Sequence, residues 1–213
     1  MFEDGDDDED DDGFRGIMAI LPIRLLGDPV LRKKAQAVNK VGAEEKALLR
    51  DMIETMIAAE GIGLAANQVG VLKRIIVFRQ GEQVRGLINP RIIKRSSEQE
   101  VNPEGCLSIP NVQGDVKRHA QIVVSGRNKE GKTVQYSCEG RVAHCVQHEI
   151  DHLDGKLFID RVVPDTLCWV VHETNKETGE EETKFIPTTV EQVEATFARR
   201  REKAYVPQPS ETT

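Results

Sequence analysis

Residues 147–152 read QHEIDH, and this stretch places His148 and His152 four positions apart with Glu149 between them. On an α-helix, residues i and i+4 lie on the same face, so both imidazoles can reach one metal ion. A catalytic metal site usually has three protein ligands and one open position for water. The function of the chain therefore depends on which residue supplies the third ligand.

The sequence on either side of this stretch predicts strands and few helices. Apolar residues at three- and four-residue spacing indicate an amphipathic helix over 43–60, and a second helix runs from about Arg141 to Leu153. The remaining segments are expected to be a glycine-spaced turn at 61–70, strands at 74–78 and 86–96 (the latter interrupted by Pro90), and a hairpin of 120–127 with 132–140. We expect an α+β fold in which antiparallel sheets pack around the helix that carries HEIDH.

Charge separates the ends of the chain from its centre. Nine of the ten residues 3–12 are acidic, and without them the net charge of −7 would be +2. Such a block repels itself, so we expect residues 1–16 to be a disordered acidic tail, with a docking arm for a basic partner as the alternative. Residues 17–165 then form the main domain and residues 166–213 a C-terminal extension.

The extension has its own pattern. Residues 168–173 and 183–187 are expected to pair as a hairpin, and residues 188–204 predict a capped helix with Val190, Val193 and Phe197 on one face. The last residues, from Tyr205 on, are expected to be a loose end.

The third metal ligand is best sought upstream of the helix. The only downstream histidine, His172, falls in an expected strand, and the downstream acids Asp154 and Asp160 stand in no recognisable context. None of the four cysteines forms a C-x-x-C pair, so each is a single thiol, either buried or a ligand. In PEGCLSIP (103–110), Cys106 follows a glycine that permits close backbone approach, and its thiolate would complete a Cys-His-His site.

Three separate segments resemble peptide deformylase: GIGLAANQ at 61–68, EGCLS at 104–108 and QHEIDHLDG at 147–155. The resemblance covers roughly Leu25 to Val163. It implies a deformylase catalytic domain over 17–165 that removes the formyl group from the N-terminal formylmethionine of new polypeptides.

This chemistry is a metal-assisted amide hydrolysis. Cys106, His148 and His152 would hold a divalent metal, and water at the open position, its pKa lowered toward ~7, would be the nucleophile. Glu149 would act as general base and then general acid. The resemblance implies that the side-chain amide of Gln68 and the backbone N–H of Leu107 stabilise the oxyanion.

Further residues are expected to contact the substrate. Glycines would let the main chain approach an extended peptide that pairs like an added strand, and the expected contact residues are Gly61, Ile62, Gly63 and Gly105. His144 lies one turn before His148, but three histidines on one straight helix cannot easily converge on one ion. The resemblance implies instead that His144 faces the pocket for the methionine side chain. We expect Arg118 to be structural.

The resemblance implies Fe(II) as the metal in the cell, with Zn, Ni or Co as possible substitutes. It also implies nascent chains and the ribosome near its exit tunnel as partners. Because the sequence shows neither an export signal nor a span of about 18 apolar residues, we expect a cytoplasmic protein that does not contact a membrane. We also expect no contact with DNA, and we expect a monomer. Two alternatives stay open: an HExxH metallopeptidase, for which Cys106 would not matter, and a non-catalytic binding protein that kept the scaffold.

Overall fold

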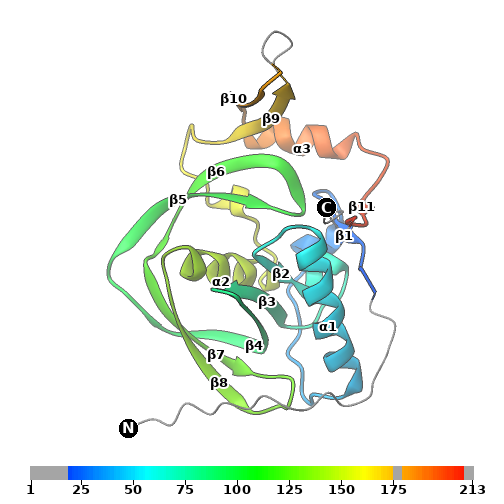
Figure 1. Cartoon of the computed structure of the whole chain (residues 1–213), viewed down its shortest axis with the longest axis vertical. Helices are drawn as coiled ribbons and strands as arrows, with labels where there is room; N and C mark the ends of the chain where they lie inside the picture. Colours follow the sequence, from blue (N-terminus) through cyan, green and yellow to red (C-terminus); the bar gives the residue numbers. More distant parts are fainter. Residues whose placement is uncertain (1–18, 175–178, 209–213) are drawn as a thin grey trace.

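The computed structural model describes residues 19–174 and 179–208, and the expected acidic tail at 1–16 lies outside that part of the chain. A five-stranded sheet has the order β2-β3-β4-β7-β8, a four-stranded sheet has the order β10-β9-β6-β5, and β1 pairs with β11 (Figure 1). All pairings between these strands are antiparallel. The expected α+β class with antiparallel sheets is confirmed.

The element bounds match most of the predicted ones. The strands are β1 (Ile23–Arg24), β2 (Gly63–Ala65), β3 (Ile75–Gln80), β4 (Gln83–Arg95), β5 (Gln99–Cys106), β6 (Ile109–His119), β7 (Gln121–Arg127), β8 (Thr133–Glu139), β9 (Cys168–Thr174), β10 (Glu181–Pro187) and β11 (Ala204–Tyr205). The α-helices are α1 (Ala43–Ala58), α2 (Gly140–Leu153) and α3 (Val190–Ala198), and short 3-10 helices occupy η1 (Pro29–Arg32), η2 (Ala66–Val69) and η3 (Phe158–Asp160).

The five-stranded sheet is covered on both faces, which explains the unbroken apolar run of β3. Successive side chains of a strand point to opposite faces. Ile75 and Val77 pack in a cluster with Met52 of α1, whereas Ile76 and Phe78 pack in a cluster with residues of α2. A strand buried on both faces therefore needs no polar alternation.

Helix α2 lies between the two large sheets (Figure 1). Its apolar side, including Ala143, Val146 and Leu153, joins the cluster against the five-stranded sheet. Its opposite side carries His148, Asp151 and other polar groups, and these are buried as well. Buried polar groups require partners, so this side of the helix is where a site is to be expected.

Two expectations upstream of α2 need correction. The expected turn at 61–70 is in part a strand, because Gly63–Ala65 pairs with Ile76–Phe78 at the edge of the sheet. Pro90 does not interrupt β4. The strand instead shifts register against β7 between Ile88 and Arg91, a bulge of the kind at which proline is tolerated, and Asn89 there takes a positive φ of 56°.

The C-terminal extension joins the fold rather than standing apart. Strands β9 and β10 pair as expected, and β9 also pairs with β6. Helix α3 is shorter than expected and ends at Ala198, with Thr189 capping its start and Phe197 in the core. The expected loose end is wrong at its start, because Tyr205 pairs with Ile23. No helix of the described residues is long and apolar enough to cross a membrane.

Candidate active site

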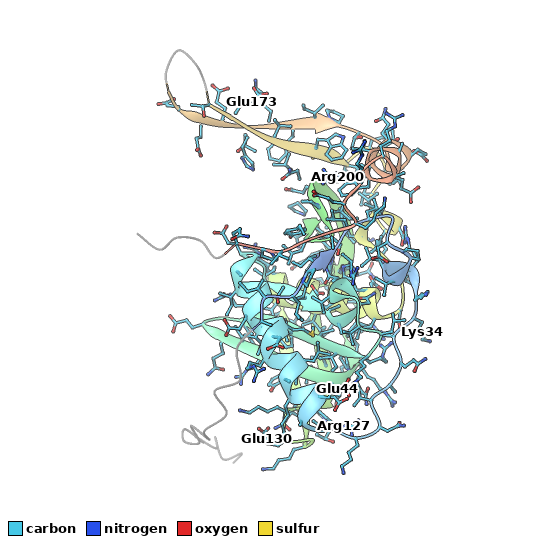
Figure 2. The ribbon with its side chains drawn as sticks, turned by 90° about the vertical axis from the view of Figure 1, so that its right-hand side faces the viewer. Lys34, Glu44, Arg127, Glu130, Glu173 and Arg200 are labelled. Carbon is cyan, nitrogen blue, oxygen red and sulfur yellow. The ribbon has the colours of Figure 1, made fainter. Side chains whose placement is uncertain are left out.

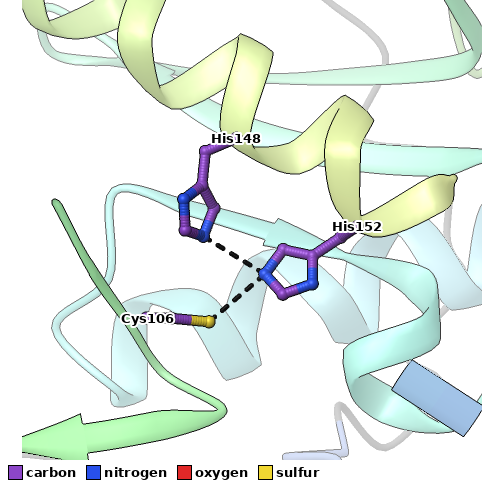
Figure 3. Close-up of side chains that lie close together, drawn as sticks. All are labelled: Cys106, His148 and His152. Atoms are coloured by element: carbon purple, nitrogen blue, oxygen red, sulfur yellow. Dashed lines mark hydrogen bonds between the residues drawn. The ribbon is translucent and has the colours of Figure 1, made fainter. Parts of the chain in front are cut away.

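The three residues expected to bind metal come together from two elements. His148 and His152 project from α2, and Cys106 ends β5 (Figure 3). The Cys106 Sγ atom lies 3.2 Å from His152 Nε2, which lies 3.1 Å from His148 Nε2. All three donor atoms lie within 4.8 Å of one another. A thiolate and two imidazole nitrogens at this spacing suit one ion such as Zn²⁺ or Fe²⁺.

A buried carboxylate fixes the orientation of His148. The Nδ1 atom of His148 donates to Glu104 Oε2 at 2.9 Å, so the Nε2 atom of His148 can face the other two candidate ligands. Arg118 in turn donates to both oxygens of Glu104, at 2.5 and 2.9 Å. Burial would raise the pKa of Glu104, but the hydrogen bonds from Arg118 and His148 outweigh burial and lower it to about 2. Glu104 is therefore an anion.

Arg118 links this carboxylate back to the metal-binding helix. Its Nη1 atom donates to Asp151 Oδ2 at 2.6 Å, and Asp151 also pairs with Arg161. Sequence reasoning placed Arg118 as structural, and the residue is buried and fully engaged in ion pairs. Arg118 also supports a proposed metal ligand indirectly, because it holds Glu104, which holds His148. The sequence did not predict this role. The available signal was Glu104, which belongs to the EGCLS segment but was given no role.

Glu149 lines the same cavity as Cys106 and His148 but is not one of the three candidate metal ligands. Burial raises its pKa to about 7, a rise that a bound cation would oppose. Its Oε2 atom has no hydrogen-bond partner among the described residues. A buried carboxylate oxygen without a protein partner can accept a hydrogen bond from a small polar molecule such as water.

Gly63 makes room for this carboxylate. A Cβ atom at Gly63 would lie 2.4 Å from Glu149 Oε1 and 2.6 Å from Cys145 Sγ. Burial raises the pKa of the Cys145 thiol well above its usual value, and the thiol donates to the Ile62 carbonyl at 3.3 Å. The glycine was expected to admit substrate backbone. The contacts show in addition that it admits the Glu149 side chain.

The amide of Gln68 has a fixed orientation. Its Oε1 atom accepts a hydrogen bond from the Ala65 N–H at 2.8 Å. Its Nε2 atom must then face the other way, and it lies 3.5 Å from Cys106 Sγ and 3.3 Å from Ser108 Oγ. The Nε2 group thus donates long hydrogen bonds to Cys106 Sγ and Ser108 Oγ, which places it beside the candidate metal ligands.

The turn that follows Cys106 is held from two sides. The Leu107 carbonyl accepts a hydrogen bond from the Tyr205 hydroxyl at 3.3 Å. A Cβ atom at Gly61 would lie 2.9 Å from the Leu107 side chain, so the glycine permits close packing there. At Gly105, by contrast, a Cβ atom would meet only the Val112 carbonyl at an ordinary 3.5 Å.

His144 lies outside the ligand set. Its Nε2 atom is 3.1 Å from the Asn102 side-chain nitrogen, which can only donate, so the His144 proton belongs on Nδ1. That Nδ1 atom is 3.5 Å from Glu104 Oε1, a distance at the limit of a hydrogen bond. Burial lowers the pKa of His144, so the ring is neutral at pH 7.

One cavity of about 960 Å³ joins these groups. It opens between β2, at the edge of one sheet, and the β5–β6 hairpin of the other, with α2 beneath. The expected site residues that line it are Gly61, Ile62, Gly63, Gln68, Gly105, Cys106, Leu107, His144, His148 and Glu149. The third candidate ligand, His152, is not among the residues that line the cavity and is the most buried of the three, only 1% exposed.

Comparison with known proteins places the chain in a family. The family model for polypeptide deformylase matches residues 20–167. A peptide deformylase of Caldanaerobacter subterraneus is 49% identical over 146 residues, which are 68% of this chain and 91% of that protein. A peptide deformylase of Dictyoglomus thermophilum is 49% identical over 148 residues, 70% of this chain and 96% of that protein.

Solved structures agree with the sequence relatives. The peptide deformylase of Thermotoga maritima superposes with a TM-score of 0.67 at 43% identity, covering 68% of this chain and 99% of that one. The enzyme of Synechococcus elongatus, solved with actinonin, gives a TM-score of 0.65 at 43% identity over 67% of this chain and 79% of that one. The chain therefore belongs to the polypeptide deformylase family and is a deformylase enzyme, a hydrolase.

Proposed function

We propose that the chain removes the formyl group from the N-terminal formylmethionine of newly synthesised polypeptides. The observation that carries this proposal is the gathering of Cys106, His148 and His152 beside Glu149 and the oriented amide of Gln68, all at one cavity. Membership of the deformylase family supports the reaction class, and the geometry supports the residue roles.

When bound to the three ligands, a divalent metal activates water and polarises a carbonyl as a Lewis acid. Glu149 accepts the proton of the attacking water through its free Oε2 atom. It then returns that proton to the amine nitrogen as the C–N bond breaks. The products are formic acid and a free N-terminal amine; the acid then passes its proton to the amine, giving formate and an ammonium group, so atoms and charge balance.

The negative charge that develops on the formyl oxygen needs donors. The Nε2 group of Gln68 is one, because the Ala65 N–H fixes the other end of the amide. The Leu107 N–H is the second, on a turn that Tyr205 holds by its carbonyl. Removing one such donor from an oxyanion site typically costs about 10²–10³ in rate.

The substrate backbone would add to the edge of the five-stranded sheet. Strand β2 is the edge strand, and Gly61, Ile62 and Gly63 line the cavity there. An extended peptide can hydrogen bond to such an edge. Gly105 would border the opposite side, and His144, neutral and held by Asn102, would form part of the wall for the methionine side chain.

The metal and the setting of the reaction extend this proposal. A thiolate with two imidazoles accepts several divalent ions, and we propose Fe(II) in the cell, with Zn, Ni or Co able to replace it. We propose a monomer that acts in the cytoplasm on nascent chains near the ribosomal exit tunnel. Division of the chain into a catalytic domain at 17–165 and an extension at 166–213 belongs to the same proposal.

The test is formate release from formyl-Met-Ala-Ser by protein prepared without oxygen, with metal analysis of the same sample. The proposal predicts rapid turnover with about one metal per chain. Metal-loaded protein that cleaves an internal peptide bond and leaves the formyl group in place would identify a metallopeptidase instead. Metal-loaded protein that hydrolyses neither bond would point to a binding protein on this scaffold.

A further inference from the structure

The C-terminal extension reaches the cleft although it lies beyond the family match, which ends at residue 167. Val170 of β9 and Tyr205 of β11 line the same cavity as Glu149 and Gln68. Strands β9 and β10 project beyond the body of the protein (Figure 2). The cleft of this chain therefore has a wall that the family match does not include.

The two faces of this hairpin differ. Trp169 stacks on Phe197 of α3, with ring centroids 6.4 Å apart, so the Trp169 face is directed toward that helix. Val170 is the next residue and must point to the other face. Its cross-strand partner is Phe185, which shares that face and is 58% exposed. A half-buried valine and an exposed phenylalanine therefore continue the cavity wall outward.

Charge is also distributed unequally between the faces. The pairing register places Cys168, His172, Thr183 and Pro187 beside Val170 and Phe185, and none of these four is acidic, lysine or arginine. The charged residue of this face is Glu181, which pairs with Thr174 at the end of the hairpin farthest from Cys168 and Pro187. The opposite face carries Glu173, Glu182 and Lys184. The part of the face around Val170 and Phe185, which continues the cavity, thus favours an apolar occupant.

The size of the cavity allows for such an occupant. Its volume of about 960 Å³ is near the upper end of the range of roughly 300–1,000 Å³ that holds drug-sized ligands. A formylmethionine alone is smaller than such ligands. Residues further along the peptide would extend past Val170, which borders the cavity beside the β5–β6 hairpin.

We infer that the Val170–Phe185 face binds apolar side chains of the substrate peptide downstream of its first two residues. The inference rests on the proposed deformylase function and deepens it, since it assigns part of the specificity to the extension. Val170 and Phe185 would be specificity-determining residues, because neither is placed to contact the formyl group.

The experiment compares kcat/KM on formyl-Met-Ala with that on formyl-Met-Ala-Ser-Leu-Leu and formyl-Met-Ala-Ser-Asp-Asp. The variants are Val170→Asn and Phe185→Asn. Val171→Asn and Ile186→Asn are the matched controls, because each residue follows the tested one in the same strand and faces the other side. Val171 is half-buried like Val170, and Ile186 is exposed like Phe185.

Wild-type enzyme should prefer the Leu-Leu peptide to the Asp-Asp peptide. Val170→Asn and Phe185→Asn should each lower kcat/KM on the Leu-Leu peptide roughly fivefold, less than a fully buried side chain would cost. Activity of these variants on formyl-Met-Ala should stay at the wild-type level, and this also checks that they fold. The two controls should be unchanged on all three peptides.

Equal losses in variants and controls, or losses as large on formyl-Met-Ala as on the longer peptide, would overturn the inference alone. Wild-type protein that is loaded with metal but inactive on formyl-Met-Ala would overturn the proposed function, and the inference with it.

Discussion

Helix α2 and the β9–β10 hairpin depart from the usual distribution of residues in opposite directions. On α2, His148, Glu149 and Asp151 are polar yet buried, whereas on the hairpin Phe185 and Ile186 are large apolar residues that are 58% and 49% exposed. Buried polar groups and exposed apolar patches are the informative exceptions in a folded protein. The first region adjoins the metal-ligand set, and the Val170–Phe185 face of the second adjoins the outer part of the same cavity.

The difference shows how each region can change. The polar groups of α2 depend on one another, because Arg118 holds both Glu104 and Asp151, and Glu104 holds His148. Loss of one member leaves another buried and unpaired. The exposed hairpin residues have no such dependence. Substitutions at α2 should therefore affect stability, metal and chemistry together, whereas substitutions on the hairpin should affect peptide preference alone.

The largest effect is expected at the metal ligands. Cys106→Ala should release most of the metal and lower kcat/KM by about 10³-fold or more, because one of three protein ligands is lost. Cys168→Ala is the matched control, as a second partly exposed cysteine outside the ligand set. Metal analysis and formate release on the same samples decide the matter. Full metal content in Cys106→Ala would remove this residue from the site.

A second test concerns the space beside Glu149. Gly63→Ala introduces a Cβ atom within 2.4 Å of the carboxylate oxygen and should displace it. A displacement of about 1 Å at a catalytic group can cost about 10²-fold, so kcat should fall to that extent. Metal content should not change, because the atoms nearest to the added Cβ belong to Glu149 and Cys145 and not to the three candidate ligands. Wild-type kcat in this variant would show that the carboxylate does not need its present position.

The network behind His148 gives the next prediction. Arg118→Met should weaken metal binding by about 10- to 100-fold, as loss of groups that orient a metal ligand usually does. It should also lower the free energy of unfolding by about 3–5 kcal/mol, because Glu104 is left buried without its counter-ion. Arg161→Met is the control, since it also pairs with Asp151 but is 41% exposed. Metal titration and urea unfolding measure the two effects, and equal effects in both variants would contradict the network.

The smallest effect is expected where the extension contacts the catalytic turn. Tyr205→Phe removes the hydrogen bond to the Leu107 carbonyl, an interaction worth about 0.5–1.5 kcal/mol. We expect kcat to fall about two- to fivefold on every peptide, with KM unchanged, since the turn and not the binding wall is loosened. A change confined to longer peptides would instead assign Tyr205 to the binding wall.

Sequence reasoning predicted the parts of the fold that depend on local pattern. Helix α1, the β7–β8 hairpin and the pairing of β9 with β10 follow from apolar periodicity and turn residues. Strand β2 was missed because it has only three residues, and its first residue, Gly63, together with Gly61 before it, is typical of a turn. The pairing of Tyr205 with Ile23 was missed because the partners are 182 positions apart in the sequence, beyond any local signal.

For the candidate site, too, the sequence predicted what depends on local pattern and not what depends on long-range pairing. Spaced motifs brought Cys106, His148 and His152 into view, because ligand types and helical spacing are properties of the sequence. The ion pair of Arg118 with Glu104 could not be predicted in the same way. It forms because strands β5 and β6 pair, and no motif spacing in the sequence indicates that contact. Contact of Val170 with the cavity depends on how β9 adds to β6, which only the assembled sheet reveals.

The central claim is that Glu149 carries the proton while Cys106, His148 and His152 hold the metal. The most direct measurement is formate release by Glu149→Gln, with metal content determined on the same sample. The predicted result is wild-type metal content with kcat lowered by about 10²–10⁴-fold, the usual contribution of a general acid–base group. Wild-type kcat in a metal-loaded Glu149→Gln protein would contradict the claim.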